Sequence, residues 1–183
     1  MAKKKPLGNI FQLKISLRDI EPPIWRRVHV EDCTLEDLHD IIQISMGWED
    51  DHMHAFEVRG VTYSHPDLDE AEDELDMTLG KIAEGRTKKF DYNYDFGDDW
   101  KHVIQIEKRL PAEEGVRYPR CVEGERAAPP EDCGGPWGYF EILKMLADPK
   151  NPKYEERLEW VGEYDPQACD LVAINKRLRR YGK

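Results

Sequence analysis

The chain of 183 residues lacks both a long apolar run and a recognisable cysteine motif. No stretch approaches the roughly 18 apolar residues that a membrane-spanning helix needs. The lysines at positions 3–5 are not followed by the apolar segment of a secretory signal. No two of the four cysteines form a Cys-x-x-Cys pair, so the standard zinc and redox motifs are absent. We therefore expect a cytoplasmic protein without membrane association or disulfide bonds.

Positive charge is scarce except at the two ends of the chain. The net charge is −11, yet residues 1–9 carry three lysines and residues 176–183 carry five basic residues, with no acid in either segment. The rest of the chain has a net charge of −19 and would repel phosphate backbones, so nucleic acid is not an expected partner of the folded body. We expect one domain over residues 1–183, with an ordered core at about 10–178 and flexible basic termini at 1–9 and 179–183.

The chain also lacks a βαβ alternation and any internal repeat. Apolar and polar residues alternate in the segments predicted as strands, which are residues 10–17, 24–30, 52–58, 90–96 and 100–106. Helical spacing predicts helices at 35–46 and 136–147, and two more that begin near Pro152 and Pro166. Residues 67–76 hold seven acids and are expected to form a mobile surface loop. We predict an α+β fold: a mostly antiparallel sheet from the N-terminal two thirds, packed with one N-terminal helix and a C-terminal group of helices.

Several short strings, taken together and in order, are typical of one known family. They include Pro22-Pro23-Ile24-Trp25-Arg26-Arg27, Met46-Gly47-Trp48, His52-Met53-His54-Ala55-Phe56, Tyr94-Asp95-Phe96-Gly97-Asp98-Asp99-Trp100-Lys101-His102, and Pro129-Pro130-Glu131-Asp132-Cys133-Gly134-Gly135. With them the chain resembles, from about Ile10 to Leu178, the plasmid-encoded open-reading-frame-three-like family, which is also labelled a TnpR-like passenger protein of an insertion element. The resemblance implies a compact α+β fold and an association with mobile elements, but no activity, and it assigns no residue a role.

The TnpR label points to a serine resolvase, and serine is scarce here. Such an enzyme needs a nucleophilic serine near the N-terminus, among arginines that stabilise the attacked phosphate. The chain has only Ser16, Ser45 and Ser64, and Ser16 stands in a strand pattern without that constellation. Together with the acidic body, this argues against a recombinase.

His52 and His54 are candidate metal ligands. On a strand, residues i and i+2 project from one face about 6–7 Å apart, close enough to share a metal ion. Further ligands would come from the hairpin and the loop at 111–136, giving a set of His52, His54, His102 and Cys121, with Asp95, Asp98 and Cys133 also available. The alternative is that both histidines hydrogen-bond loop carbonyls. The aspartates around Gly97 could likewise hold Mg²⁺ or Ca²⁺, although aspartate and glycine are also what a tight turn selects. No cofactor is expected, and a divalent metal stays an alternative.

Cys133 stands just before a predicted helix start, where backbone N–H groups lower the pKa of a thiol. Two adjacent acids, Glu131 and Asp132, act in the opposite direction. A nucleophilic cysteine and a buried structural thiol are the two alternatives, and the second is the commoner.

The function that these patterns favour is a non-catalytic module that binds a small ligand or a protein. Its site would be concave, lined by the aromatic hairpin and by the loops at 47–54 and 119–136. The predicted ligand-binding residues are Arg26, Trp48, Tyr94, Asp95, Asp98, Trp100, His102, Glu131, Asp132 and Cys133. The rival is a metal-assisted hydrolase of a phosphoester or an amide. A third reading is that the same residues only stabilise a loop-rich fold.

Overall fold

The computed structural model describes residues 9–162 and 164–181. Its elements in chain order are β1 (Ile10–Leu17), β2 (Trp25–Val30), α1 (Leu35–Met46), β3 (His54–Val58), β4 (Val61–Ser64), β5 (Glu72–Asp73), the 3-10 helix η1 (Glu74–Asp76), α2 (Leu79–Glu84), β6 (Lys89–Tyr94), β7 (Trp100–Leu110), β8 (Arg120–Glu125), α3 (Gly135–Leu146), α4 (Tyr154–Val161) and α5 (Leu171–Leu178).

All eight strands belong to one sheet, in the order β5-β4-β3-β6-β7-β1-β2-β8. Every neighbouring pair is antiparallel except β4 and β5. The alternation in β1 explains how the sheet presents an apolar face: Phe11, Leu13 and Ile15 are fully buried, whereas the residues between them are partly exposed. The register places Ile15 opposite Ile104 of β7, so the buried face continues across the central strands.

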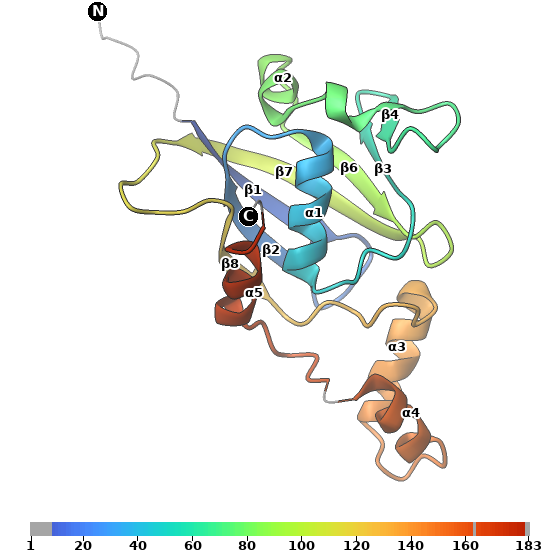
Figure 1. Ribbon diagram of the computed structural model, residues 1–183. Coiled ribbons are helices and arrows are strands. Elements are labelled where there is room, and N and C mark those ends of the chain that lie inside the picture. The colour runs from blue at the N-terminus through green and yellow to red at the C-terminus, as the bar shows by residue number, and fades with distance from the viewer. Residues whose placement is uncertain (1–8, 163, 182–183) are drawn as a thin grey trace, which may run out of the picture.

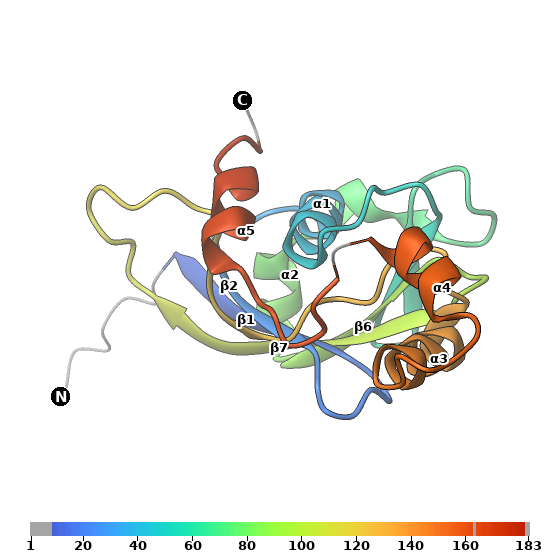
Figure 2. The ribbon, with the colours of Figure 1, turned by 90° about the horizontal axis from the view of Figure 1, so that it is seen from below.

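Helix α1 lies across that buried face (Figures 1 and 2). It begins with a capping box, in which Thr34 and Asp37 satisfy each other's free backbone N–H groups, and it ends at Gly47 with φ 89°. Leu35, Leu38 and Ile42 form its fully buried stripe. The opposite face of the sheet carries a polar cluster, in which Arg27 pairs with Glu107 and Glu123 and Gln12 donates to Glu107.

The C-terminal helices occupy two places. Figure 1 shows α5 beside β8 and α1, whereas α3 and α4 lie together beyond one end of the sheet. Asn175 of α5 bonds both free backbone groups of Cys121, its Oδ1 accepting from the N–H and its Nδ2 donating to the carbonyl. The helix therefore protects edge strand β8.

The α+β prediction is confirmed, and the differences lie in details. The last helix begins at Leu171 rather than near Pro166, because Asp170 is the residue that caps it. The acidic stretch at 67–76 includes β5 and η1, and Glu74 in it is buried. The predicted flexible ends fall mostly on residues 1–8 and 182–183, outside the described residues, while Tyr181 donates a hydrogen bond to Asp37 (2.7 Å). The single-domain assignment stays a prediction. Within the described part of the chain, no helix is both long and apolar enough to span a bilayer.

Candidate functional site

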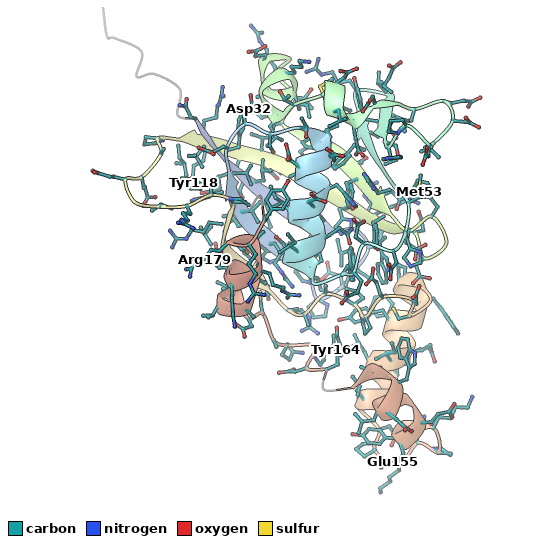
Figure 3. All side chains as sticks on the ribbon, in the orientation of Figure 1. Asp32, Met53, Tyr118, Glu155, Tyr164 and Arg179 are labelled. Atoms are coloured by element: carbon teal, nitrogen blue, oxygen red, sulfur yellow. The ribbon has the colours of Figure 1, made fainter. Side chains whose placement is uncertain are left out.

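Three segments meet at the end of the sheet where β6 turns into β7. They are the loop between α1 and β3, the turn at 95–99, and the loop that leads into α3. The Asp95 N–H donates to the Met53 carbonyl (2.9 Å), which joins the first two segments. The Gly134 N–H donates to Asp98 Oδ2 (3.1 Å), which joins the turn to the start of α3. Figure 3 shows Met53 at this margin of the molecule, far from Tyr118 and Arg179.

His52, Asp95 and Asp132 form the polar centre of this junction. His52 Nε2 lies 2.9 Å from Asp132 Oδ1 and 3.7 Å from Asp95 Oδ2. The imidazole and the Asp132 carboxylate are not aligned for a hydrogen bond, and among the described residues His52 Nε2 has no hydrogen-bond partner. One nitrogen and two carboxylate oxygens thus converge within 4.8 Å, an arrangement that suits a metal ion or a cationic group.

The backbone holds this centre in place without a ligand. Asp95 and Asp132 adopt left-handed conformations, with φ of 55° and 53°, which aspartate tolerates better than most residues. Asp95 Oδ1 accepts hydrogen bonds from the N–H groups of Gly97 and Asp98, so its other oxygen stays directed at His52. The turn therefore presents one carboxylate oxygen in a fixed position.

Three predicted ligand-binding residues fasten the loops to each other, and two of them, Trp48 and Glu131, also line a hollow of about 560 Å³ between these loops and α5. Tyr94 donates to Glu131 Oε1 (2.5 Å), and Glu131 Oε2 accepts from the Glu49 N–H (2.6 Å). Trp48 donates from Nε1 to the Pro129 carbonyl (2.9 Å) and stacks on Tyr94 with ring centroids 5.1 Å apart. Trp48, Tyr94 and Glu131 hold the position of the loop that carries Asp132.

Trp100 and His102 lie beneath the junction, in the core. Their exposed fractions are 1% and 0%. His102 Nδ1 donates to the Trp100 carbonyl (2.9 Å), and burial lowers the pKa of this imidazole to about 4. His102 is therefore neutral at pH 7 and out of reach of a ligand in this conformation.

The side chains of Arg26, Cys121 and Cys133 are also buried. The Arg26 guanidinium donates to three backbone carbonyls, those of Ser45, Trp25 and Glu125. Burial raises the pKa of the Cys133 thiol to about 12 and that of Cys121 to about 11, so both are protonated at pH 7. The Cys133 Sγ contacts the Gly135 carbonyl (3.8 Å). Neither thiol has the lowered pKa of a nucleophile.

The four predicted metal ligands are not brought together. His54 points into the core, where its Nε2 donates to Glu74 (2.7 Å), while His52 joins Asp95 and Asp132. Cys121 lies on β8 near α5. Among the described residues the groups with ligand atoms close enough for a metal are His52, Asp95 and Asp132, and His39, Asp40 and Asp50.

Sequence reasoning missed the exposed apolar side chains next to the polar centre in the chain. Met53, Phe96 and Trp137 are 40%, 46% and 76% exposed. Met53 and Phe96 belong to the first two segments of the junction, and Trp137 lies in the first turn of α3, just after the third segment. We call the three polar residues together with these three apolar ones the loop-end site: His52, Met53, Asp95, Phe96, Asp132 and Trp137. A usable signal was the position of Phe96 at the tip of a hairpin and of Trp137 in a first helical turn, where neither can reach the core.

The fold and this junction define an α+β protein with one large sheet, helix α1 across its buried face, further helices at its margins, and loops gathered at one sheet end. The chain belongs to the plasmid pRiA4b ORF-3-like family, whose model matches residues 9–173. It is 38% identical over 177 residues to the uncharacterized protein y4hQ of Sinorhizobium fredii (strain NBRC 101917 / NGR234), covering 93% of this chain and 91% of that one. A crystal structure of the protein of unknown function MM3350 from Methanosarcina mazei Go1 matches with a TM-score of 0.84 and 40% identity, covering 89% of this chain and 96% of that chain.

Proposed function

We propose that the chain is a non-catalytic binding module, and that the loop-end site binds a small ligand or a protein segment carrying a positive charge beside an apolar group. The observation that carries this proposal is the convergence of His52, Asp95 and Asp132, on segments that also carry the exposed side chains of Met53 and Phe96 and lead into that of Trp137. Pockets and interfaces combine a few fixed polar groups with apolar contact area in this way.

The charge of the ligand follows from the charge of the surface. Acids crowd this end of the sheet, where Glu49, Asp50 and Asp51 precede His52 and where the turn and the loop before α3 add Asp95, Asp98, Asp99, Glu131 and Asp132. Lys101 pairs with Asp99 (2.6 Å), and no salt bridge to a lysine or arginine among the described residues involves Asp95 or Asp132. An incoming amine or guanidinium would therefore meet uncompensated carboxylates.

The states of Cys133 and His102 argue against covalent catalysis at this site. A nucleophile needs a lowered pKa or an adjacent base, and the Cys133 thiol, with its pKa raised to about 12, has the reverse. His102, one of the predicted metal ligands, is fully buried. The proposal of a binding module therefore requires no reacting group. The family label also suggests an association with insertion elements. We include this association in the proposal, but the binding test described next does not address it.

The test is the binding of a short fluorescein-labelled peptide in which lysine and leucine alternate, measured by fluorescence anisotropy. Asp95→Asn with Asp132→Asn should weaken binding about tenfold, because two charge-assisted contacts are lost together. Asn at position 95 still accepts the hydrogen bonds of the turn, so the fold should persist. Trp137→Ser should weaken binding of this peptide but not that of an otherwise identical peptide with glycine in place of leucine.

The matched control removes two acids elsewhere. Asp69→Asn with Asp76→Asn changes the net charge equally, at two exposed positions. If this control weakens binding as much as the site variant, the peptide senses only the net charge of the protein, and the loop-end site is not its binding site.

A metal-assisted hydrolase is the second candidate, and the specific observation favouring it is that His52, Asp95 and Asp132 offer one nitrogen and two oxygens within 4.8 Å. Elemental analysis by mass spectrometry of tag-free protein, purified without chelator, tests it. Close to one equivalent of a transition metal, lost in His52→Ala but retained in His65→Ala, would favour this candidate. A folded protein without metal would remove its main support.

A further inference from the structure

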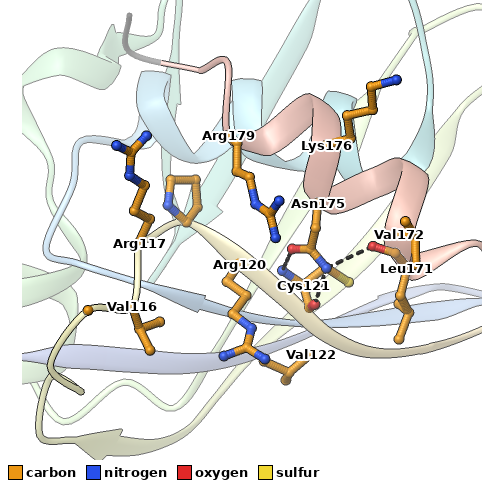
Figure 4. A pocket seen from close by; sticks show the side chains of 12 residues that line it. Val116, Arg117, Arg120, Cys121, Val122, Leu171, Val172, Asn175, Lys176 and Arg179 are labelled. Atoms are coloured by element: carbon orange, nitrogen blue, oxygen red, sulfur yellow. Dashed lines mark hydrogen bonds between the residues drawn. The ribbon is translucent and has the colours of Figure 1, made fainter.

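A hollow lies on the side of the molecule away from the loop-end site, between α5 and the segment that leads into and includes the start of β8. It is a groove of about 920 Å³, and its lining shares no residue with the loop-end site. Four cationic side chains line it and no acidic residue does: Arg117, Arg120, Lys176 and Arg179. In Figure 4, Arg179 extends from α5 toward β8, whereas Lys176 points away from the strand. We call this hollow the basic groove.

These four cations are available for a ligand. All are exposed, and none of their side chains makes a hydrogen bond or ion pair with a described residue. Elsewhere on the surface Arg18, Arg27 and Lys101 are each paired with a carboxylate. Setting the four groove cations aside would change the net charge from −11 to −15, so they concentrate positive charge on an otherwise acidic protein.

The groove also offers apolar contact area. Val116, Val122, Leu171 and Val172 line it, and Val172 is 81% exposed. An exposed branched apolar residue beside several arginines is typical of a surface that binds both acidic and apolar side chains. The adjoining hollow, which shares Arg117 and Arg179 with the groove, is lined by one acid, Glu31.

We propose that the basic groove binds an acidic peptide segment of a partner protein, with carboxylates on Arg117, Arg120 and Arg179 and an apolar side chain on Val172 and Leu171. Arginine presents a planar fork that pairs with carboxylates in a bidentate manner. Among polyanions a peptide fits better than a nucleic acid for two reasons. The groove lining contains no aromatic residue on which a base could stack, and a longer phosphate backbone would run onto the acidic body.

The groove is rigid enough to recognise one segment. Asn175 joins α5 to β8 through its two hydrogen bonds with Cys121, and a third to the Leu171 carbonyl fixes the side chain itself. These bonds fix the backbone of α5 relative to that of β8 before any ligand arrives. Preorganisation of this kind lowers the entropic cost of binding.

The experiment uses the full chain and a short fluorescein-labelled peptide in which glutamate and leucine alternate, followed by anisotropy. Arg120→Gln with Arg179→Gln should weaken binding about tenfold, since two charged contacts disappear. Lys88→Gln with Lys89→Gln, two exposed cations on and beside β6, is the matched control and should leave binding unchanged. Val172→Asn should weaken the leucine peptide and not an equally charged glycine peptide. Unfolding midpoints of all variants should match the parent, because every substituted residue is exposed.

Three results would overturn the proposal. Equal losses in the control and groove variants would show that only net charge matters. Equal affinity for the leucine and glycine peptides would remove the apolar part of the site. A single-stranded DNA oligonucleotide that displaces the peptide and depends more strongly on Arg120 and Arg179 would assign the groove to phosphates. The loop-end variant Asp95→Asn/Asp132→Asn should still bind the glutamate–leucine peptide. Either proposal can therefore fail while the other holds.

Discussion

His39 of α1 and His54 of β3 stack face to face in the core, with ring centroids 3.5 Å apart and planes only 7° from parallel. His54 donates to Glu74 (2.7 Å), and His39 lies between Asp50 and the Tyr92 hydroxyl, each at 2.7 Å. Two imidazoles at this separation cannot both carry a proton without strong repulsion. Burial, followed by the charge of His54, accordingly lowers the pKa of His39 to about 3.

This arrangement predicts a loss of stability in mild acid. Unfolded His39 takes up a proton near pH 6.5, whereas the folded residue does so only near pH 3. The unfolded state therefore binds more protons between these values, and stability falls as the pH is lowered through 6.5. His102, with its folded pKa of about 4, acts in the same direction. At pH 5 each of these two histidines should lower the free energy of unfolding by about 2 kcal/mol relative to pH 7.5.

Urea unfolding at pH 7.5 and pH 5 checks this prediction. Asp40 and Asp50 have raised pKa values and oppose this trend, because the folded state binds their protons more tightly, whereas His29, whose pKa is lowered by burial, adds to it. His102→Gln still offers a donor to the Trp100 carbonyl but does not titrate, and it should remove about 2 kcal/mol of the pH dependence. An unchanged pH dependence in this variant would contradict the assignment.

Glu74 should matter far more to stability than its acidic neighbours. Its exposed fraction is 2%, and it accepts the hydrogen bond of buried His54. Glu74→Ala leaves that imidazole without its partner in the core and should cost about 3 kcal/mol in the free energy of unfolding. Glu72→Ala, at an exposed position on β5, should cost less than about 0.5 kcal/mol. Equal effects would mean that the pair is not formed.

Gly135 sets the contact between α3 and the β6–β7 turn. Its φ is +66°, and a Cβ added there would clash with the Asp98 carbonyl oxygen. Gly135→Ala should therefore cost about 3 kcal/mol in the free energy of unfolding and weaken binding at the loop-end site. Gly60 has φ +78° and open space around it, so Gly60→Ala reports the backbone strain alone, about 1 kcal/mol. A Gly135→Ala variant no less stable than Gly60→Ala would refute the contact.

Asn175 is expected to hold α5 on the sheet edge. Asn175→Ala leaves the N–H and carbonyl of Cys121 without their partner, and should lower the free energy of unfolding by about 2 kcal/mol. Lys176→Ala, at the exposed neighbouring position, should change it by less than about 0.5 kcal/mol. Thermal unfolding followed by circular dichroism measures both, and similar midpoints would contradict the role of Asn175.

Local signals predicted elements well where they were complete. The strand over Ile10–Leu17 and the helix over Leu35–Met46 carry full alternation, a capping box and a terminal glycine. The start of α5 was misplaced because Asp165-Pro166 resembles a helix start, whereas Asp170 provides the cap. Which of the two possible helix starts is used depends on how the segment packs on β8. The local spacing of residues carries no information about that packing.

The candidate site could be predicted only in outline. The residues of the hairpin and its flanking loops do gather at one end, but the aromatic face of the hairpin packs beneath α1 and Trp48 instead of lining a cavity. His52 and His54 separate because β3 begins only at His54 and Glu74 draws that ring into the core. Both outcomes depend on contacts between residues far apart in sequence, and no spacing rule encodes them.

The most direct test of the loop-end site is an amide chemical-shift map of ¹⁵N-labelled protein titrated with the lysine–leucine peptide. The account predicts that the largest shifts fall on residues 51–53, 95–98 and 131–138, and that they vanish in Asp95→Asn/Asp132→Asn. Shifts centred on the acidic stretch at 67–76, or spread evenly over the surface, would contradict it.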